Sequence, residues 1–324
     1  MASTETRTRV CARVALSLAI AAALTACASA AITPLPTHSA PVDVTPSVTS
    51  VTPHLVRHVL DSLFDQSMYR TATWGVLVLS PTGDTVYARD PARLLVPASN
   101  MKLITTAVAL VQLGPDFHFR DTAVALPLRD TVPSDFGPMY DTTFVGMHPL
   151  RDILPAILKP SQNRLAEQLF ETLALERSGI VSRDSAAAIE QRQLAEWNIP
   201  HDGYIIRDGS GFDHGNYLSP ETIIRVLQAV RRDTAFTVFY EALPIAGVDG
   251  TLARRMRASA AEGHVRAKTG SLGAVRALAG YVTTLSGTEL TFSFVCNGFT
   301  VAPEVVTATM DSAVVLLAGT VPTP

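Results

Sequence analysis

Cysteine is scarce in this chain, with only Cys11, Cys27 and Cys296 among its 324 residues. The first two lie in or beside an N-terminal targeting segment, which leaves Cys296 as the one thiol in the rest of the chain. Because a disulfide needs two thiols at bonding distance, we expect none. Cys296 follows an apolar run, and we expect it to be a buried thiol of the core.

Charged residues are also sparse, at 17% of the sequence, and they nearly balance, with 26 lysines and arginines against 29 aspartates and glutamates. The net charge of −3 provides no basic surface for nucleic acid, and we expect no nucleic-acid partner. Hydrophobic residues make up 47%, which favours a folded core over disorder. After the N-terminus, no stretch approaches the ~20 uninterrupted apolar residues of a membrane-spanning helix.

The N-terminus has the features of an export signal. Three arginines precede an apolar stretch at 14–24, and Leu-Thr-Ala-Cys follows at 24–27. This sequence resembles a bacterial lipobox, in which cleavage leaves a lipidated cysteine. We therefore interpret 1–26 as a lipoprotein signal peptide and Cys27 as the lipidated residue. The alternative is an ordinary secretory peptide that is cut within 28–31.

The next segment, 27–53, is rich in proline, serine and threonine, a composition typical of an extended tether. It leads into one folded domain over 54–320. This arrangement predicts an exported protein, periplasmic or elsewhere in the cell envelope, that meets the membrane through its lipid anchor only. Its oligomeric state is not predicted.

Apolar periodicity predicts strands near both ends of the folded domain and helices between them. Strands are expected at 73–80, 85–89, 264–270, 274–285 and 289–298. Helices are expected at 54–67, from Ser99 onward, and at 149–158, 163–177, 184–197, 220–231, 234–241 and 302–318. This order indicates a single sheet built from the two ends of the chain, covered by helices, with a mostly helical lobe from its middle.

Ser99-Asn-Met-Lys102 opens an apolar run that is long enough for a buried helix. Ser99 would lie near the helix N-terminus, where free N–H groups and the dipole favour developing negative charge. Lys102 follows on the same helix face. A desolvated lysine beside a second cation has a lowered pKa and can take the proton of the serine hydroxyl. Taken alone, the motif more often marks a capping serine with a solvated lysine.

Ser161-Gln-Asn163 precedes a second helical pattern. In a catalytic interpretation, Ser161 relays a proton to a leaving amine and Asn163 donates to a substrate amide. In the alternative interpretation, Ser161 is only the cap of the helix that follows.

Lys268-Thr-Gly lies in a strand-like segment. Lys268 would place a positive charge beside the nucleophile, and Thr269 would offer a hydroxyl to a substrate carboxylate. Gly270 would let a ligand backbone approach closely. The N–H groups of Ser271 and Ser99 would form an oxyanion hole. The alternative is an edge strand with an exposed lysine.

The three motifs in this order form the set found in penicillin-binding proteins and class A β-lactamases. Longer segments narrow the match. The segments 97–103, 113–116, 208–212, 216–220 and 243–252 together resemble the D-alanyl-D-alanine carboxypeptidase/endopeptidase family, the class C low-molecular-mass penicillin-binding proteins.

That resemblance implies an α/β (α+β) fold of the serine β-lactamase/transpeptidase type, an antiparallel sheet flanked by helices plus an all-helical lobe. It implies a serine carboxypeptidase or endopeptidase that cleaves peptidoglycan stem peptides through an acyl-enzyme and binds β-lactam antibiotics. Ser99, Lys102 and Ser161 would be catalytic, and Asn163 with 268–271 would bind substrate. We expect no cofactor and no metal ion.

The spacing of the motifs departs from the family pattern. Its members typically insert extra domains of roughly two hundred residues between the first two motifs, whereas Ser161 follows Ser99 by only 62 residues. This spacing approaches that of a class A β-lactamase, the alternative enzyme, although no deacylating glutamate motif is recognisable between 161 and 210. The other alternative is a non-catalytic penicillin-binding envelope lipoprotein, against which the presence of Ser99, Lys102 and Lys268 argues.

Two further features are interpreted as structural. Asp208-Gly-Ser-Gly is glycine-rich and polar, which favours a turn without a chemical role. Glu190 and Glu196 lie on a helical pattern and are expected on its solvated face.

Overall fold

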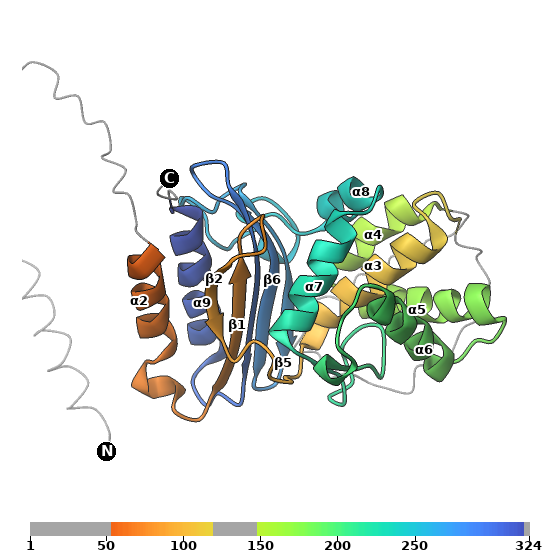
Figure 1. Ribbon diagram of the computed structural model, residues 1–324, viewed down its shortest axis with the longest axis horizontal. Coiled ribbons are helices and arrows are strands. Elements are labelled where there is room, and N and C mark those ends of the chain that lie inside the picture. Colours follow the sequence, from red (N-terminus) through yellow and green to blue (C-terminus); the bar gives the residue numbers. More distant parts are fainter. Residues whose placement is uncertain (1–52, 119–147, 321–324) are drawn as a thin grey trace, which may run out of the picture. The chain divides into compact units, whose positions relative to one another are not determined.

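The computed structural model describes residues 53–118 and 148–320 (Figure 1). Its centre is a five-stranded antiparallel sheet in the order β2-β1-β7-β6-β5. The strands are β1 (Thr73–Leu79), β2 (Thr85–Arg89), β5 (Val265–Leu272), β6 (Val275–Thr283) and β7 (Glu289–Asn297). β1 pairs with β7, and Trp74 lies opposite Cys296. The sheet therefore joins the two ends of the domain, as the sequence predicts.

The inner strands are apolar on both faces because helices cover both sides of the sheet. Every side chain of β7 from Leu290 to Cys296 is buried. β6 and β7 are joined by a tight turn in which Gly287 has a φ of +81°, a conformation that glycine adopts without strain. β5, which carries Lys268, is left at the edge of the sheet.

One face of the sheet is covered by α2 (Pro53–Phe64) and α9 (Pro303–Ala318), which lie side by side in Figure 1. Aromatic rings fill the space beneath them, and the centroids of Phe64 and Trp74 are 4.7 Å apart. Cys296 is buried in this layer as a free thiol, which confirms the prediction.

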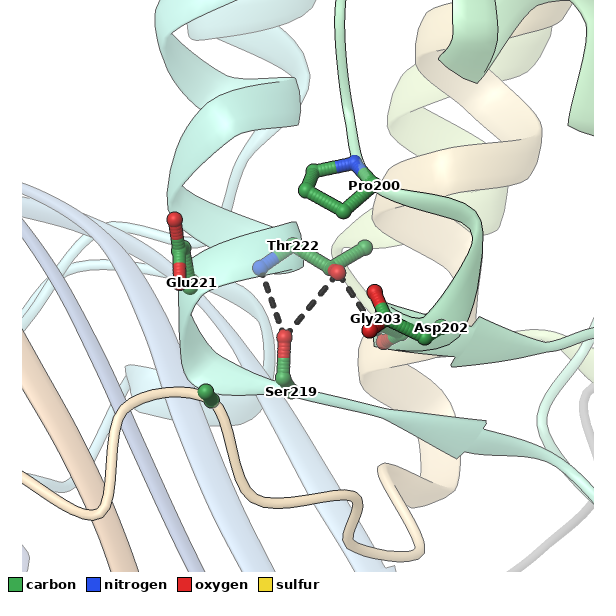
Figure 2. Close-up of a pocket in the computed structure, with 7 residues that line it drawn as sticks. Pro200, Asp202, Gly203, Ser219, Glu221 and Thr222 are labelled. Atoms are coloured by element: carbon green, nitrogen blue, oxygen red, sulfur yellow. Dashed lines mark hydrogen bonds between the residues drawn. The ribbon is translucent and has the colours of Figure 1, made fainter.

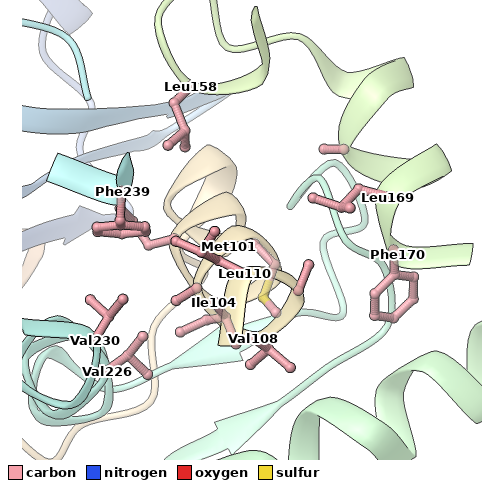
Figure 3. Close-up of a cluster of buried hydrophobic side chains, with 14 of the residues drawn as sticks. Met101, Ile104, Val108, Leu110, Leu158, Leu169, Phe170, Val226, Val230 and Phe239 are labelled. Carbon is pink, nitrogen blue, oxygen red and sulfur yellow. The ribbon is translucent and has the colours of Figure 1, made fainter. Parts of the chain in front are cut away.

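The other face is covered by the helical lobe. Its helices are α3 (Met101–Leu113), α4 (Leu150–Leu158), α5 (Asn163–Ser178), α6 (Arg183–Glu196), α7 (Pro220–Arg231) and α8 (Phe236–Ala242). α3 is the central helix, and all of its side chains from Met101 to Leu110 are buried. Figure 3 shows Ile104 and Val108 of α3 among side chains of the surrounding helices. This packing fixes the helix that carries Lys102.

Short elements connect these layers. They are η1 (Ser67–Tyr69), η2 (Ala98–Asn100), η3 (His201–Gly203), η4 (Gly250–Leu252) and a small ribbon of β3 (Tyr204–Ile205) and β4 (Tyr217–Leu218). Within the described ranges, no helix has both the length and the apolar character needed to span a membrane.

The expected fold class is confirmed, and the predicted helices and strands form close to their expected bounds. The prediction for Glu190 is wrong, because this residue is fully buried between α6 and its neighbours, while Glu196 is exposed as expected. The signal peptide at 1–26, Cys27 and the tether lie outside the described residues, except for Pro53 at the start of α2.

Candidate active site

Ser99 lies in η2, a single turn that leads directly into α3. The residue before it, Ala98, has a φ of +47°, which is rare for a residue with a side chain. Two glycines, Gly211 and Gly270, pack closely against this turn. A Cβ at Gly211 would lie 1.9 Å from the Ala98 carbonyl oxygen, and one at Gly270 would lie 2.6 Å from the Pro97 carbonyl oxygen. The position of Ser99 is therefore fixed by backbone contacts that only glycine permits.

Lys102 is 0% exposed, so the alternative of a solvated lysine is wrong. Its Nζ contacts three oxygens, Ser99 Oγ at 2.9 Å, Asn163 Oδ1 at 2.6 Å and the Ser210 carbonyl at 2.6 Å. The amide and peptide oxygens can only accept, so they take two N–H groups of the amine. The third position faces the Ser99 hydroxyl, which can donate. A neutral Lys102 therefore directs its lone pair at the Ser99 proton.

The protonation state of Lys102 suits this arrangement. Burial lowers the pKa of Lys102 to about 7, although the charges of Asp208 and Glu167 act in the opposite direction. A lysine with such a pKa is partly neutral near neutral pH and can accept a proton.

Ser161 and Lys268 form the second half of the site. Ser161 lies between α4 and α5 with a φ of +65°. Lys268 Nζ donates to Ser161 Oγ at 2.8 Å and to the Thr269 carbonyl at 2.9 Å. Lys268 is also fully buried, and burial followed by the nearby charge of Lys102 lowers its pKa well below the usual value. The alternative of an exposed lysine is wrong.

The N-terminus of α5 shows which residue caps this helix. Gln162 is the N-cap, and its side chain accepts from the backbone N–H of Arg164 at 2.9 Å. Ser161 is therefore not the cap, as the alternative interpretation supposed. Asn163, the first residue of α5, points its amide oxygen at Lys102. Its role toward a substrate stays a prediction.

The rest of the Lys-Thr-Gly strand lies beside η4. Thr269 Oγ1 donates to Thr251 Oγ1 at 3.0 Å, which places two partly exposed hydroxyls together. Ser271 is exposed, and its part in an oxyanion hole stays a prediction. Gly270 also allows the close approach of the Pro97 backbone, and its role toward a ligand stays a prediction.

Sequence reasoning missed two contacts to the site. Ser210, in the stretch interpreted as merely structural, supplies a carbonyl to Lys102. Thr251 orients the hydroxyl of Thr269. The glycines of Asp208-Gly-Ser-Gly were the available signal, since glycines mark close backbone approach as well as turns.

The hollow in Figure 2 is a separate feature. It is lined by residues of η3 and the start of α7, among them Asp202, Gly203 and Glu221. Its hydrogen bonds belong to the α7 cap, where Ser219 Oγ accepts from the Thr222 N–H at 3.0 Å. Within 53–118 and 148–320, no group of three or more His, Cys, Asp or Glu side chains is arranged to hold a metal ion.

Comparison with known proteins agrees with this geometry. The model of the D-Ala-D-Ala carboxypeptidase 3 (S13) family matches residues 56–128 and 145–320. A D-alanyl-D-alanine carboxypeptidase from an Actinomadura species is 37% identical over 154 residues, which are 46% of this chain and 28% of that protein. The sequence match thus spans less than a third of the relative's length.

Solved structures show the same fold. Penicillin binding protein 4 from Haemophilus influenzae aligns with a TM-score of 0.68 at 15% identity, covering 80% of this chain and 99% of the other. A β-lactamase from Chitinophaga pinensis aligns with a TM-score of 0.61 at 17% identity, covering 81% of this chain and 98% of the other.

Proposed function

We propose that this chain, which belongs to the D-Ala-D-Ala carboxypeptidase 3 (S13) family, is a serine D-alanyl-D-alanine carboxypeptidase that acts on peptidoglycan stem peptides through an acyl-enzyme. The observation that carries this proposal is the fully buried Lys102, whose Nζ lies 2.9 Å from Ser99 Oγ. Its other two partners are obligate acceptors. This geometry makes Ser99 a nucleophile with a base already in place.

In the acylation step, Ser99 Oγ attacks the carbonyl carbon of the penultimate D-alanine and Lys102 takes the hydroxyl proton. The backbone N–H groups of Ser99 and Ser271 hold the oxyanion of the tetrahedral intermediate. The C–N bond then breaks, and the terminal D-alanine leaves as an amine after gaining a proton. An ester between Ser99 and the remaining peptide is left, and water hydrolyses it.

Ser161 is the proton donor to that amine. Its hydroxyl accepts from Lys268 at 2.8 Å, so its own proton is free to point into the site. Lys268 and Thr269 bind the terminal carboxylate, and Asn163 donates to the substrate amide through its remaining N–H groups.

The test is covalent labelling with a fluorescent penicillin, followed by mass spectrometry of the labelled peptide. We expect a stable label on Ser99 in the wild type and none in Ser99→Ala. Label on another residue, or none on the folded wild-type protein, would rule out the proposal. Label that turns over within seconds would instead favour a β-lactamase, the alternative that the short interval between the first two motifs suggests.

We also propose that the protein is exported and held at the membrane by a lipid on Cys27. The support is the Leu-Thr-Ala-Cys sequence at 24–27 and the proline-rich tether after it. Cys27→Ser should lose membrane association in fractionated cells, whereas Cys11→Ser should keep it. Equal membrane association of both variants would contradict the lipid anchor.

A further inference from the structure

We propose that Glu167 is a positioning residue for Lys102 and acts through the backbone of Ser210. The reaction it serves is that of the proposed function above. Glu167 lies on α5, one turn after Asn163, and does not itself contact Ser99 in any hydrogen bond of the described residues. Its influence passes through the loop formed by residues 208–211.

Two successive peptide units of this loop are held on both sides. In the first, the Ser210 N–H donates to Glu167 Oε1 at 2.8 Å, and the Gly209 carbonyl accepts from Thr105 Oγ1 at 2.9 Å. In the second, the Gly211 N–H donates to Asp208 Oδ1 at 2.7 Å, and the Ser210 carbonyl accepts from Lys102 at 2.6 Å. The peptide unit whose carbonyl accepts from Lys102 is thus held by Asp208, and the peptide unit before it is held by Glu167.

The loop packs closely against α5 and the turn that carries Ser99. A Cβ at Gly209 would lie 2.5 Å from Cβ of Phe170, and one at Gly211 would lie 1.9 Å from the Ala98 carbonyl oxygen. The loop is therefore wedged between α5 and the turn that carries Ser99. Without Glu167, the Ser210 N–H would lose its acceptor, and only the bond from the Gly211 N–H to Asp208 would still orient the Ser210 carbonyl toward Lys102.

The second effect of Glu167 is electrostatic. The charges of Asp208 in the loop and Glu167 on α5 act on Lys102, and the charge of Lys102 acts on Lys268 of β5. Glu190 on α6 interacts with both carboxylates. Arg183 Nη2 at the start of α6 lies 3.7 Å from Glu167 Oε2.

The negative charges of Asp208 and Glu167 raise the pKa of Lys102 against the larger lowering by burial. Burial, followed by the charge of Asp208, raises the pKa of Glu167 itself. Removing the charge of Glu167 therefore lowers the pKa of Lys102 further.

The sign of the kinetic effect follows from the role of the amine. Only neutral Lys102 accepts the Ser99 proton, so acylation increases as pH rises through the pKa of the lysine. In Glu167→Gln the amide oxygen still accepts the Ser210 N–H but the charge is gone. In the curve of acylation rate against pH, the acid limb of Glu167→Gln should therefore lie at lower pH, while the plateau rate stays close to that of the wild type. Glu167→Ala loses the acceptor as well, and its plateau should fall about 10- to 100-fold.

The matched control is Glu171→Gln, one turn further along α5. Glu171 is half-buried and close to Glu167, yet it is not among the charges that shift Lys102. The first measurement is the rate of penicillin acylation against pH for the wild type and the three variants. The second is the titration of Lys102 itself, followed by NMR of lysine labelled at its ε-carbon and assigned by loss of the signal in Lys102→Arg.

We expect a lower titration midpoint for Lys102 in Glu167→Gln and an unchanged one in Glu171→Gln. Equal midpoints in wild type and Glu167→Gln, or the same shift in both glutamine variants, would overturn the electrostatic effect. An acylation plateau in Glu167→Ala equal to that in Glu167→Gln would overturn the positioning role. The NMR readout does not depend on catalysis. If Glu167→Gln lowers the titration midpoint of Lys102 but penicillin does not label the wild-type protein, the proposed function is refuted and the coupling of Glu167 to Lys102 still holds.

Discussion

The site contains groups that are costly to bury. Lys102 and Lys268 are both fully buried, and neither forms an ion pair with a carboxylate in the described part of the chain. They are tolerated because Lys102 donates to two oxygens at 2.6 Å and Lys268 donates to two at 2.8 and 2.9 Å. Burial also shifts both toward the neutral form. The unusual backbone at Ala98 and Ser161, both with positive φ, adds to the cost.

Glu190 gives a prediction about stability. Among the described residues neither of its buried carboxyl oxygens has a hydrogen-bond partner, since the nearby Thr105 hydroxyl donates to the Gly209 carbonyl instead, and burial raises its pKa well above the usual value. In the unfolded chain this carboxyl ionises near pH ~4.3, whereas in the folded state it stays protonated to higher pH. Folding is therefore increasingly disfavoured as pH rises above that value.

Glu190→Gln removes this ionisation at nearly constant size. The variant should match the wild type near pH ~4 and exceed it in free energy of unfolding by about 1 kcal/mol or more near pH ~8. Urea denaturation at the two pH values measures the difference. Glu196→Gln, on the exposed side of α6, is the control and should differ little from the wild type at either pH. A constant difference for Glu190→Gln across pH would contradict the ionisation argument.

At this scale the sequence predicts residue types and spacings but not environments. The three-residue spacing of Ser99 and Lys102 predicts that they share a helix face, and they do. The burial of Lys102 depends on α5 and the 208–211 loop, which are distant in sequence. For the same reason Glu190 was expected in solvent, since a local pattern cannot show which side of a helix the neighbouring helices cover.

Among elements, the junction of α4 and α5 is held by the segment before β5. Lys159, at the end of α4, pairs with Asp249 at 2.6 Å, and its carbonyl accepts from the Thr251 N–H at 2.9 Å. Asp249 Oδ1 also accepts from the Ile245 N–H at 2.9 Å. Ser161 follows Lys159 by two residues. We call the contacts of Lys159 with Asp249 and Thr251 the clamp. It fixes the position from which the Ser161 hydroxyl contacts Lys268.

Asp249→Asn tests that clamp, because the amide oxygen can still accept from Ile245 while the ion pair is lost. The pair is partly exposed, so the loss of stability should be below about 1 kcal/mol. Penicillin acylation should nevertheless fall several-fold, since proton delivery at Ser161 depends on its position. Glu221→Gln breaks the ion pair of Glu221 with Arg225 on α7, away from the site, and should leave acylation unchanged. Equal acylation in both variants would show that the clamp has no functional part.

Element bounds were well predicted because apolar periodicity is local. The helix expected at 220–231 forms as Pro220–Arg231, where Pro220 and the Ser219 cap are both readable in the sequence. The register of β1 on β7 was not predictable, since two apolar strands that are buried on both faces offer no alternation to align.

For the whole molecule, the short interval between the first two motifs predicts an open site. Extra domains beside a cleft can supply remote contacts with substrate, and without them we expect recognition to rest on contacts of the terminal carboxylate with Lys268 and Thr269. We expect hydrolysis of small D-Ala-D-Ala peptides or model esters with little dependence on upstream residues. Amidation of the terminal carboxylate should lower kcat/KM about 100-fold. Equal cleavage of amide and free acid would place recognition elsewhere.

The pairing of β1 with β7 has a consequence for the order in which the molecule is made. β1 leaves the ribosome well before its partner β7, because the helices of the lobe lie between them in the sequence. Contacts between such distant segments form late, whereas the helices of the lobe are close in sequence and can associate first. Ser99 and Lys102 would then be present well before the strand that carries Lys268. A nascent chain would therefore remain unreactive toward penicillin until β5 and the strands that pair beside it had emerged.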